Sequence, residues 1–328
     1  PAELDPHKTS LTAAWHVIEH IYDGLVSVSP ALTPVPALAG LPAGLAVPDP
    51  WSPGAIASLA AAKRVLLVGT GLTAVDMALS LDQAGFAGSI TALSRRGLRP
   101  RAHTETGPAV GAVSRPQAKG SHLLRAIRRR ATEIGWRAAV DELRPHVQDL
   151  WRTHSPAEQD RFLRHARPYW DVHRHRFAPA VDRRIAELEA AGRLRFAAGE
   201  LVAAAPHDGG ARIAFRPRGG DGLEHMQVDR AINCTGPDGD LRRVPDALVA
   251  DLLDTGLIRS DAHRLGIDVD HLGRVRGATG EAHDHLFAVG PITKGEAWEI
   301  VAVPDIRRQV WNLARFLADA HWVGGEGL

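Results

Sequence analysis

The pattern of apolar and polar positions divides the chain into segments with different expected structures. Residues 11–25 carry apolar side chains at helical spacing, and seven prolines between residues 30 and 53 then interrupt regular backbone pairing. This proline-rich stretch is expected to be an extended connection between domains. Residues 118–192 are rich in basic side chains and have a helical pattern. In residues 193–215 apolar and polar side chains alternate in a way that suits antiparallel strands.

A strand, a glycine turn, a helix and a second strand follow one another from residue 64 onward. The apolar run Val65-Leu66-Leu67-Val68 fits a strand that is buried on both faces. Helical periodicity then runs from Leu72 to Ala84, and Ser89-Ile90-Thr91-Ala92-Leu93 forms a second strand pattern. This order predicts a βαβ unit.

The last third of the chain contains two more short strand patterns and a closing helix. The first runs from Val228 to Asn233 and is followed by Cys234-Thr235-Gly236-Pro237. The second, His285-Leu286-Phe287-Ala288-Val289-Gly290, is typical of a strand that runs into a glycine turn. A helix is predicted from Pro304 to about Ala318, because proline is tolerated in the first turn of a helix.

The glycine turn has the form of a dinucleotide-binding fingerprint, Gly69-Thr70-Gly71-Leu72-Thr73-Ala74. In such a turn the first glycine permits a sharp change of direction, and the second lets the backbone approach a pyrophosphate at the helix N-terminus. Ala74 occupies the third position, where a small residue is needed for packing. A purely structural glycine turn is the alternative, but the preceding strand and the following helix favour dinucleotide binding.

The end of the second strand indicates which dinucleotide binds. Sites that select NAD usually carry an acidic residue there, whereas this chain has Ser94-Arg95-Arg96. Guanidinium groups pair with phosphate oxygens in a two-pronged geometry, which suits the 2′-phosphate of NADP. The alternative is a solvated loop that happens to be basic, so NADP is favoured but not established at this point.

Composition limits the classes of protein that remain. A chain of 328 residues with 45% apolar and 23% charged residues suggests about two globular domains. The net charge of +1 argues against a nucleic-acid or membrane binder, and no apolar run is long enough for a membrane span. The first residues do not resemble a signal peptide. Because Cys234 is the single cysteine, disulfide reductases are excluded and a cytoplasmic location is the default expectation.

Other candidate sites favour structural interpretations. His173 and His175 form an H-x-H pattern that, on a strand, could supply two metal ligands. The sequence shows no carboxylate or third histidine at a persuasive spacing, and the adjacent arginines would repel a cation, so no metal is expected. The basic residues and tryptophans of segment 118–184 are typical of nucleic-acid binding. Irregularly spaced tryptophans more often pack in a core, and an anionic cofactor would also require a positive face, so no nucleic-acid partner is expected.

Several single residues near the expected site have no assigned role. Cys234 and Asp76 are expected to be structural, since no histidine lies beside the cysteine and a carboxylate in the first turn stabilises a helix N-terminus. Lys294, Glu296 and Glu299 follow the strand pattern at 285–290, but their spacing assigns them no chemistry. Catalytic residues therefore stay unidentified.

The combination of these motifs resembles a bacterial family of FAD/NAD(P)-binding proteins, relatives of the flavin-containing monooxygenases and of an FAD-dependent urate hydroxylase. The resemblance spans roughly residues 47–318 and rests on the fingerprint together with Ser94-Arg95-Arg96-Gly97-Leu98, Pro100 and His103. Further matching segments are Arg161-Phe162-Leu163-Arg164-His165, Trp170-Asp171-Val172-His173-Arg174-His175-Arg176, Asn233-Cys234-Thr235-Gly236-Pro237, Ala288-Val289-Gly290-Pro291 and Trp298-Glu299-Ile300.

The resemblance implies an α/β fold in which an NAD(P) domain interrupts an FAD domain. It predicts a remnant of the FAD domain at 1–59, a Rossmann-like nicotinamide domain at 60–236 with a helical insertion at 118–192, and a C-terminal FAD-type part at 237–328. Thr235, Gly236, Gly290 and Pro291 would contact cofactor. We call residues 285–318 the return segment, because they correspond to the part of the FAD domain that lines the flavin.

The implied activity is that of an FAD-dependent, NADPH-using oxidoreductase, of the monooxygenase type, on a small-molecule substrate. No GxGxxG precedes residue 60, where the family carries its FAD fingerprint. The FAD half is therefore expected to be absent from this chain or to come from a partner chain, with a homodimer as another possibility. The alternatives are a cofactor-binding scaffold without redox activity and a plain NADPH–flavin reductase.

Overall fold

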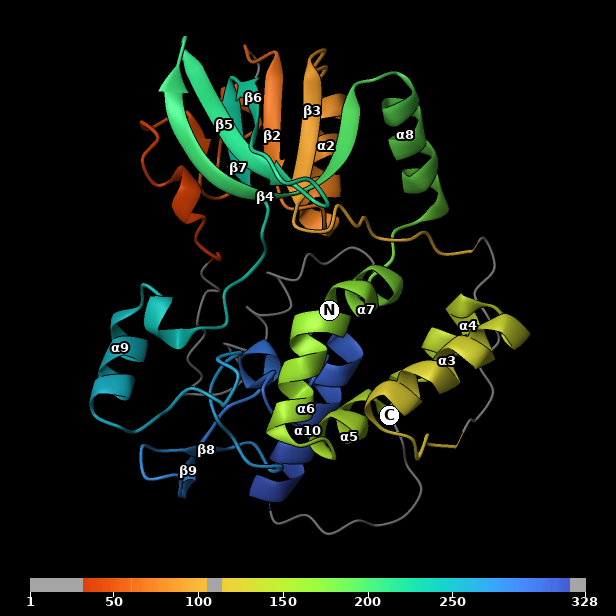
Figure 1. The fold of residues 1–328 in the computed structure, drawn as a ribbon. Helices are drawn as coiled ribbons and strands as arrows, with labels where there is room; N and C mark the ends of the chain where they lie inside the picture. The colour runs from red at the N-terminus through yellow and green to blue at the C-terminus, as the bar shows by residue number, and fades with distance from the viewer. Residues whose placement is uncertain (1–31, 60, 105–113, 319–328) are drawn as a thin grey trace, which may run out of the picture.

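The computed structural model describes residues 32–59, 61–104 and 114–318. Figure 1 shows them arranged in two lobes, one built on a β-sheet and the other mainly helical. The helix expected at residues 11–25 lies outside the described residues. Within these ranges no helix combines the length and the apolar character that crossing a membrane requires.

The sheet lobe is α/β and contains a seven-stranded sheet in the order β1-β7-β2-β3-β4-β5-β6. The pairs from β1 to the first half of β4 are parallel, and the pairs β4–β5 and β5–β6 are antiparallel. An irregularity between Leu201 and Ala203 bends β4, so the sheet curls and one strand serves both halves. The strands are β1 Ala46–Val47, β2 Arg64–Val68, β3 Ser89–Ser94, β4 Leu194–His207, β5 Gly210–Pro217, β6 Glu224–Val228 and β7 Arg230–Asn233.

Alternate residues of β2 point into two cores, which explains why the strand is apolar at every inner position. Val65 and Leu67 pack against the helices α2 (Leu72–Gln83) and α8 (Pro179–Ala190) on one face. Leu66 and Val68 pack against the antiparallel strands β5 and β6 on the other face. The predicted βαβ unit is confirmed, and burial on both faces is what its apolar run requires.

The second lobe contains the other helices and a small hairpin. It has its own apolar core, formed by α9 and the residues around the hairpin, including Leu241, Val249, Ile258 and Val275. Its elements are α3 Gly120–Ile134, α4 Trp136–Asp141, α5 Val147–Arg152, α6 Pro156–Arg161, the π-helical turn η4 Phe162–Ala166, α7 Arg167–Arg174, α9 Ala247–Asp254, β8 Arg274–Arg276, β9 Ala282–Phe287 and α10 Val303–Leu317. Short 3₁₀ turns are η1 Pro36–Leu38, η2 Ala57–Leu59, η3 Arg144–His146, η5 Leu241–Arg243 and η6 Gly290–Thr293.

Four details differ from the sequence-based expectation. The proline-rich connection is not only extended, because residues 46–47 pair with β7 as the edge strand β1. The strand expected from Val228 to Asn233 is divided at Asp229, whose carboxylate accepts from the amides of Lys63 and Arg64. His173 and His175 lie at the C-terminal end of α7 and not on a strand. The strand expected at 285–290 begins earlier and ends at Phe287.

Asp82, near the end of α2, ties three elements of the sheet lobe together. Its carboxylate lies 2.8 Å from Arg184 on α8 and 2.8 Å from Arg193, just before β4. Hydrogen bonds from Arg184 hold the pKa of Asp82 below its ordinary value. The charged form is thus the form that stabilises this corner of the fold.

We expect Asp82→Asn to lower the free energy of unfolding by about 1–2 kcal/mol at neutral pH, because the ionised carboxylate is what the guanidinium groups bind. A carboxylate whose pKa is depressed on folding stabilises above its ordinary value of 3.8 and loses that effect as pH falls through its folded-state pKa. The difference between wild type and variant should therefore shrink as pH falls below about 4. Urea unfolding measured from pH 7 downward checks this, with the exposed Asp221→Asn as control. A difference that is constant with pH would contradict it.

Candidate functional site

The carboxyl ends of three neighbouring parallel strands bring three predicted groups together. Gly69–Ala74 follows β2, Ser94 ends β3 and is followed by Arg95 and Arg96, and Thr235–Gly236 comes after β7. Ligands of open α/β sheets bind outside the carboxyl ends of the strands. In Figure 1 this end of the sheet faces the helical lobe.

The first glycine of the turn is required by close backbone packing. Gly69 has φ +126°, and a Cβ at this position would lie 2.3 Å from the carbonyl oxygen of Cys234 at the end of β7. Its amide also donates to the carbonyl of Leu93 at 2.8 Å. Only glycine can therefore let the chain pass between β7 and β3 and enter α2 at this angle.

The second glycine faces open space. Gly71 is the N-cap of the twelve-residue helix α2, and a Cβ built on it would meet nothing within 4 Å. No side chain caps this helix, so the amides of its first turn are left for another acceptor. Free first-turn amides together with the helix dipole form an anion-binding position, and this geometry fits the pyrophosphate of a dinucleotide.

The remaining fingerprint residues hold the turn in place. Ala74 is 1% exposed and packs in the core between α2 and the sheet. Thr70 is buried, and its hydroxyl lies 2.8 Å from the Ser94 hydroxyl and also donates to the carbonyl of Leu98. The glycine turn is thereby fastened to the loop after β3. Leu72 is partly exposed at 37%, and Thr73 is half-buried.

The two predicted arginines have different environments. Arg95 is exposed, and none of the ion pairs found in the described part of the chain includes it. Arg96 is half-buried, donates from its guanidinium to the carbonyl of Arg164 at 3.3 Å, and lies 5.7 Å from the ring centre of Tyr169. Ser94 accepts a hydrogen bond from the amide of Gly97 at 3.0 Å. Of the two arginines, Arg95 is therefore the one whose guanidinium has no partner among the described residues.

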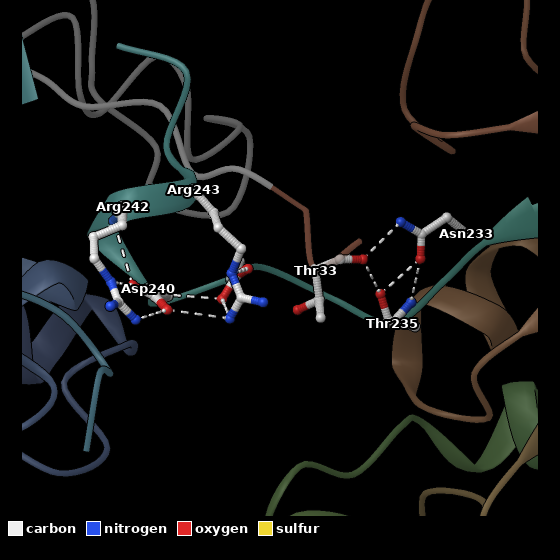
Figure 2. A network of polar contacts seen from close by, with 7 residues as sticks. Thr33, Asn233, Thr235, Asp240, Arg242 and Arg243 are labelled. Carbon is white, nitrogen blue, oxygen red and sulfur yellow. Dashed lines mark hydrogen bonds and ion pairs between the residues drawn. The ribbon is translucent and has the colours of Figure 1, made fainter. Parts of the chain in front are cut away.

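Thr235 and Gly236 lie where β7 leads into the second lobe, beside residue 33 (Figure 2). The carbonyl of Thr33 accepts from the Asn233 amide at 3.0 Å and from the Thr235 hydroxyl at 2.9 Å. The Gly236 carbonyl accepts from the Thr33 amide at 3.0 Å. The segment around Thr33 and the end of β7, far apart in sequence, therefore run side by side. Their polar groups mostly hydrogen-bond to one another.

Cys234, just before them, is buried, and burial raises the pKa of its thiol to about 12. The thiol is therefore neutral at physiological pH and is not a nucleophile. This agrees with the structural role expected from the sequence.

Gly290 and Pro291 belong to the helical lobe. The Gly290 amide donates to the side-chain oxygen of Gln309 on α10 at 2.7 Å, and its carbonyl accepts from the buried Thr293 hydroxyl at 2.8 Å. Gln309 also donates to Thr293 at 3.0 Å. Both backbone groups of Gly290 are thus engaged within the lobe, while Pro291 is exposed.

A buried glutamate, to which the sequence patterns assign no role, joins α7 to the return segment. Glu299 is 4% exposed, has the left-handed φ of +67°, and accepts from the Trp170 indole at 2.9 Å. Arg174 lies 3.3 Å and His175 3.5 Å from its carboxylate. Burial acts to raise the pKa of Glu299, but these donors hold it below its ordinary value. Helical spacing of Trp170 and Arg174 was the signal that could have shown a shared partner.

Asp171, His175 and Glu299 form the one group among the described residues whose spacing would allow a metal ion, with ligand atoms within 4.8 Å of one another. Positive groups already occupy this position, since Arg174 pairs with Glu299 and Arg167 lies 3.4 Å from Asp171. Glu299 also accepts a hydrogen bond from Trp170. The arrangement is better explained as an ion-pair cluster that fastens α7 than as a metal centre.

A large cavity lies away from the glycine turn. It has a volume of about 1120 Å³ and lies between residues 50–62 and the C-terminal end of α2, with Trp51, Met77 and Phe86 among its lining residues. This is the opposite end of α2 from Gly71. Its lining is largely apolar, and Lys63 is the sole charged residue among the described residues that form it.

Sequence comparison finds neither a matching family model nor a matching curated protein. Solved structures do match. An ornithine hydroxylase from Pseudomonas aeruginosa is 14% identical, with a TM-score of 0.55 over 88% of this chain and 60% of its own. An ornithine N-hydroxylase from Kutzneria sp. 744, with reduced FAD, NADP⁺ and L-ornithine, is 15% identical, with a TM-score of 0.50 over 79% of this chain and 54% of its own.

A third match is a cadaverine monooxygenase from Erwinia amylovora bound to FAD, which is 12% identical, with a TM-score of 0.56 over 89% of this chain and 59% of its own. The chain therefore spans 54% to 60% of the length of these three structures. It shares the fold of flavoprotein monooxygenases, and the expected α/β class is confirmed. The narrower resemblance to one bacterial family stays a prediction.

Replacing Gly69 should show how tightly the turn is constrained. We expect Gly69→Ala to cost about 3 kcal/mol or more, because an added Cβ would overlap the Cys234 carbonyl and the residue would keep a strained φ. Gly209→Ala is the matched control, since Gly209 has φ +73° but open space around a Cβ, and should cost about 1 kcal/mol. Urea unfolding of both variants checks this. Equal losses would show that backbone contact does not constrain the turn.

Proposed function

We propose that this protein is an FAD-dependent, NADPH-using oxidoreductase of the monooxygenase type that acts on a small molecule. The observation that carries the proposal is the turn between β2 and α2, in which Gly69 is held against β7 and Gly71 opens the uncapped helix N-terminus to a ligand. The fold shared with ornithine and cadaverine hydroxylating enzymes supports the flavoprotein part.

The nicotinamide dinucleotide fits this site residue by residue. The first-turn amides after Gly71 would hold the pyrophosphate, and the exposed Arg95 would pair with the 2′-phosphate. Thr70 and Ser94 would act indirectly, since their mutual hydrogen bond fixes the turn relative to the loop that carries Arg95. The exposed Thr235 lies just after the neighbouring strand β7. When bound, NADPH supplies a hydride, and this chain's residues orient it.

The described residues do not provide an equally good fit for FAD. The return segment would offer Gly290, yet its amide is already bonded to Gln309 and its carbonyl to Thr293. Within the described ranges, the turn after β2 is the single GxGxxA-type strand–helix junction. FAD use is therefore supported by the shared fold and not by contacts of these residues, and no step is assigned to a residue facing the flavin.

That difference favours a second candidate function, a cofactor-binding scaffold or subunit whose FAD half comes from another chain. It would have the same nicotinamide site, since the site depends only on the sheet lobe. The two functions differ in whether the protein itself holds a flavin that NADPH can reduce.

The experiment is anaerobic titration of the purified full-length protein with NADPH, before and after incubation with FAD. Protein that carries flavin absorbance, which NADPH bleaches, would support the oxidoreductase. A separate aerobic assay measures NADPH consumption. Oxygen-dependent consumption that rises with an added amine, such as ornithine or cadaverine, would support a monooxygenase. Protein that binds NADPH but remains colourless after FAD treatment would overturn the enzyme in favour of the scaffold.

Gly71→Ala tests the dinucleotide position itself. A Cβ there would project into the open space above the helix, so we expect NADPH to bind about tenfold more weakly. Stability should change by about 1 kcal/mol or less, because the conformation is allowed for any residue and a Cβ meets no neighbour. Calorimetric titration and urea unfolding measure the two effects. Unchanged affinity would place the dinucleotide elsewhere.

A further inference from the structure

Arg95 and Arg96 are adjacent in sequence, yet only one of them is free to bind a ligand. Arg95 is exposed and unpaired among the described residues, whereas the Arg96 guanidinium is held between the Arg164 carbonyl and the Tyr169 ring. The Nε atom of Arg96 is inaccessible to solvent and has no hydrogen-bond partner. A phosphate arriving from solvent would therefore meet Arg95 and not Arg96.

The acceptor of Arg96 is a carbonyl that the local sequence leaves without its usual donor. In an α-helix the amide four residues later would bond the Arg164 carbonyl, but that residue is Pro168, which has no N–H. The helix deforms into the π-helical turn η4 immediately before α7. Arg96, from the loop after β3, supplies the missing donor across the boundary between the two lobes.

Helix α7 lies at the junction of the lobes in Figure 1, and it is held on both sides. Tyr169 contacts Arg96 of the sheet lobe, whereas the next residue, Trp170, donates to Glu299 of the return segment at 2.9 Å. The end of α7 is also fixed, because the Arg101 amide donates to the Val172 carbonyl at 2.9 Å. Arg96 thus connects the beginning of α7 to the sheet lobe.

We propose that Arg96 is a positioning residue that holds α7 against the sheet lobe and, through Glu299, also positions the return segment. Arg95 is the residue of the pair that recognises the 2′-phosphate. The Arg95 part rests on the proposed function. The Arg96 part is a property of the fold. The two adjacent arginines therefore have different roles. Arg95 determines cofactor specificity, and Arg96 connects the regions proposed to hold the two cofactors.

The test compares Arg95→Ala and Arg96→Ala in the full-length protein with two readouts. Calorimetry gives the ratio of NADP⁺ to NAD⁺ affinity, and hydrogen exchange gives the protection of residues 161–170. Arg95→Ala should lower the affinity ratio about tenfold or more and leave exchange unchanged, because a charge-assisted pair to the 2′-phosphate is lost. Arg96→Ala should speed exchange in 161–170 about tenfold and change the affinity ratio less than about twofold.

Two further variants show whether Arg96 acts through the contacts described. Arg96→Lys keeps a cation and a donor near Tyr169 and should retain most of the protection. Pro168→Ala gives the Arg164 carbonyl an intrahelical donor, so replacing Arg96 by alanine in that background should have a smaller effect than in wild type.

A selective loss of NADP⁺ affinity in Arg96→Ala, with exchange unchanged, would overturn the proposal. Equal effects of Arg96→Ala in the presence and absence of Pro168 would also count against it. If wild type binds neither dinucleotide, the proposed function fails together with the role of Arg95. The exchange measurements still decide separately whether Arg96 holds α7 against the sheet lobe.

Discussion

The contact between Gly69 and the carbonyl of Cys234 is the constraint from which the geometry of the site follows. A Cβ at residue 69 would lie only 2.3 Å from that oxygen, so only glycine lets the chain leave β2 along this path. This direction starts α2 over the sheet, where Ala74 packs in the core, and leaves Gly71 facing open space. The same turn is fastened to the next loop by Thr70 and Ser94, so the pyrophosphate position and the loop that carries Arg95 are set together.

The second lobe depends on the sheet lobe through a few polar connections. The end of β7 runs beside Thr33, where Asn233 and Thr235 share one carbonyl (Figure 2). Helix α7 is held between the loop after β3 and the return segment. The Glu299 carboxylate accepts a hydrogen bond from Trp170 of α7, and the Glu299 backbone has a left-handed conformation. Strain at a buried charged residue persists only where its surroundings hold it in place, and here the surroundings are the tryptophan and arginine of α7.

Sequence patterns predicted the sheet lobe well because its signals are local. An apolar run, two glycines and a periodic helix follow one another directly in the sequence, and these local patterns indicate β2, the turn and α2. The position of the H-x-H pair and the role of Glu299 were not predictable in this way. His175 lies at the end of a helix whose start is altered by Pro168 and a π-helical turn. Glu299 contacts Trp170 across a separation of 129 residues in the sequence. The different environments of Arg95 and Arg96 likewise depend on a carbonyl from another lobe.

A crystal structure of the protein with NADP⁺ is the most direct test of the central claim, that the turn after β2 is a nicotinamide dinucleotide site. We expect pyrophosphate oxygens within hydrogen-bonding distance of the first amides of α2 beside Gly71, and the 2′-phosphate against the guanidinium of Arg95. A dinucleotide bound elsewhere, for instance in the apolar cavity at the far end of α2, with the glycine turn unliganded, would contradict it.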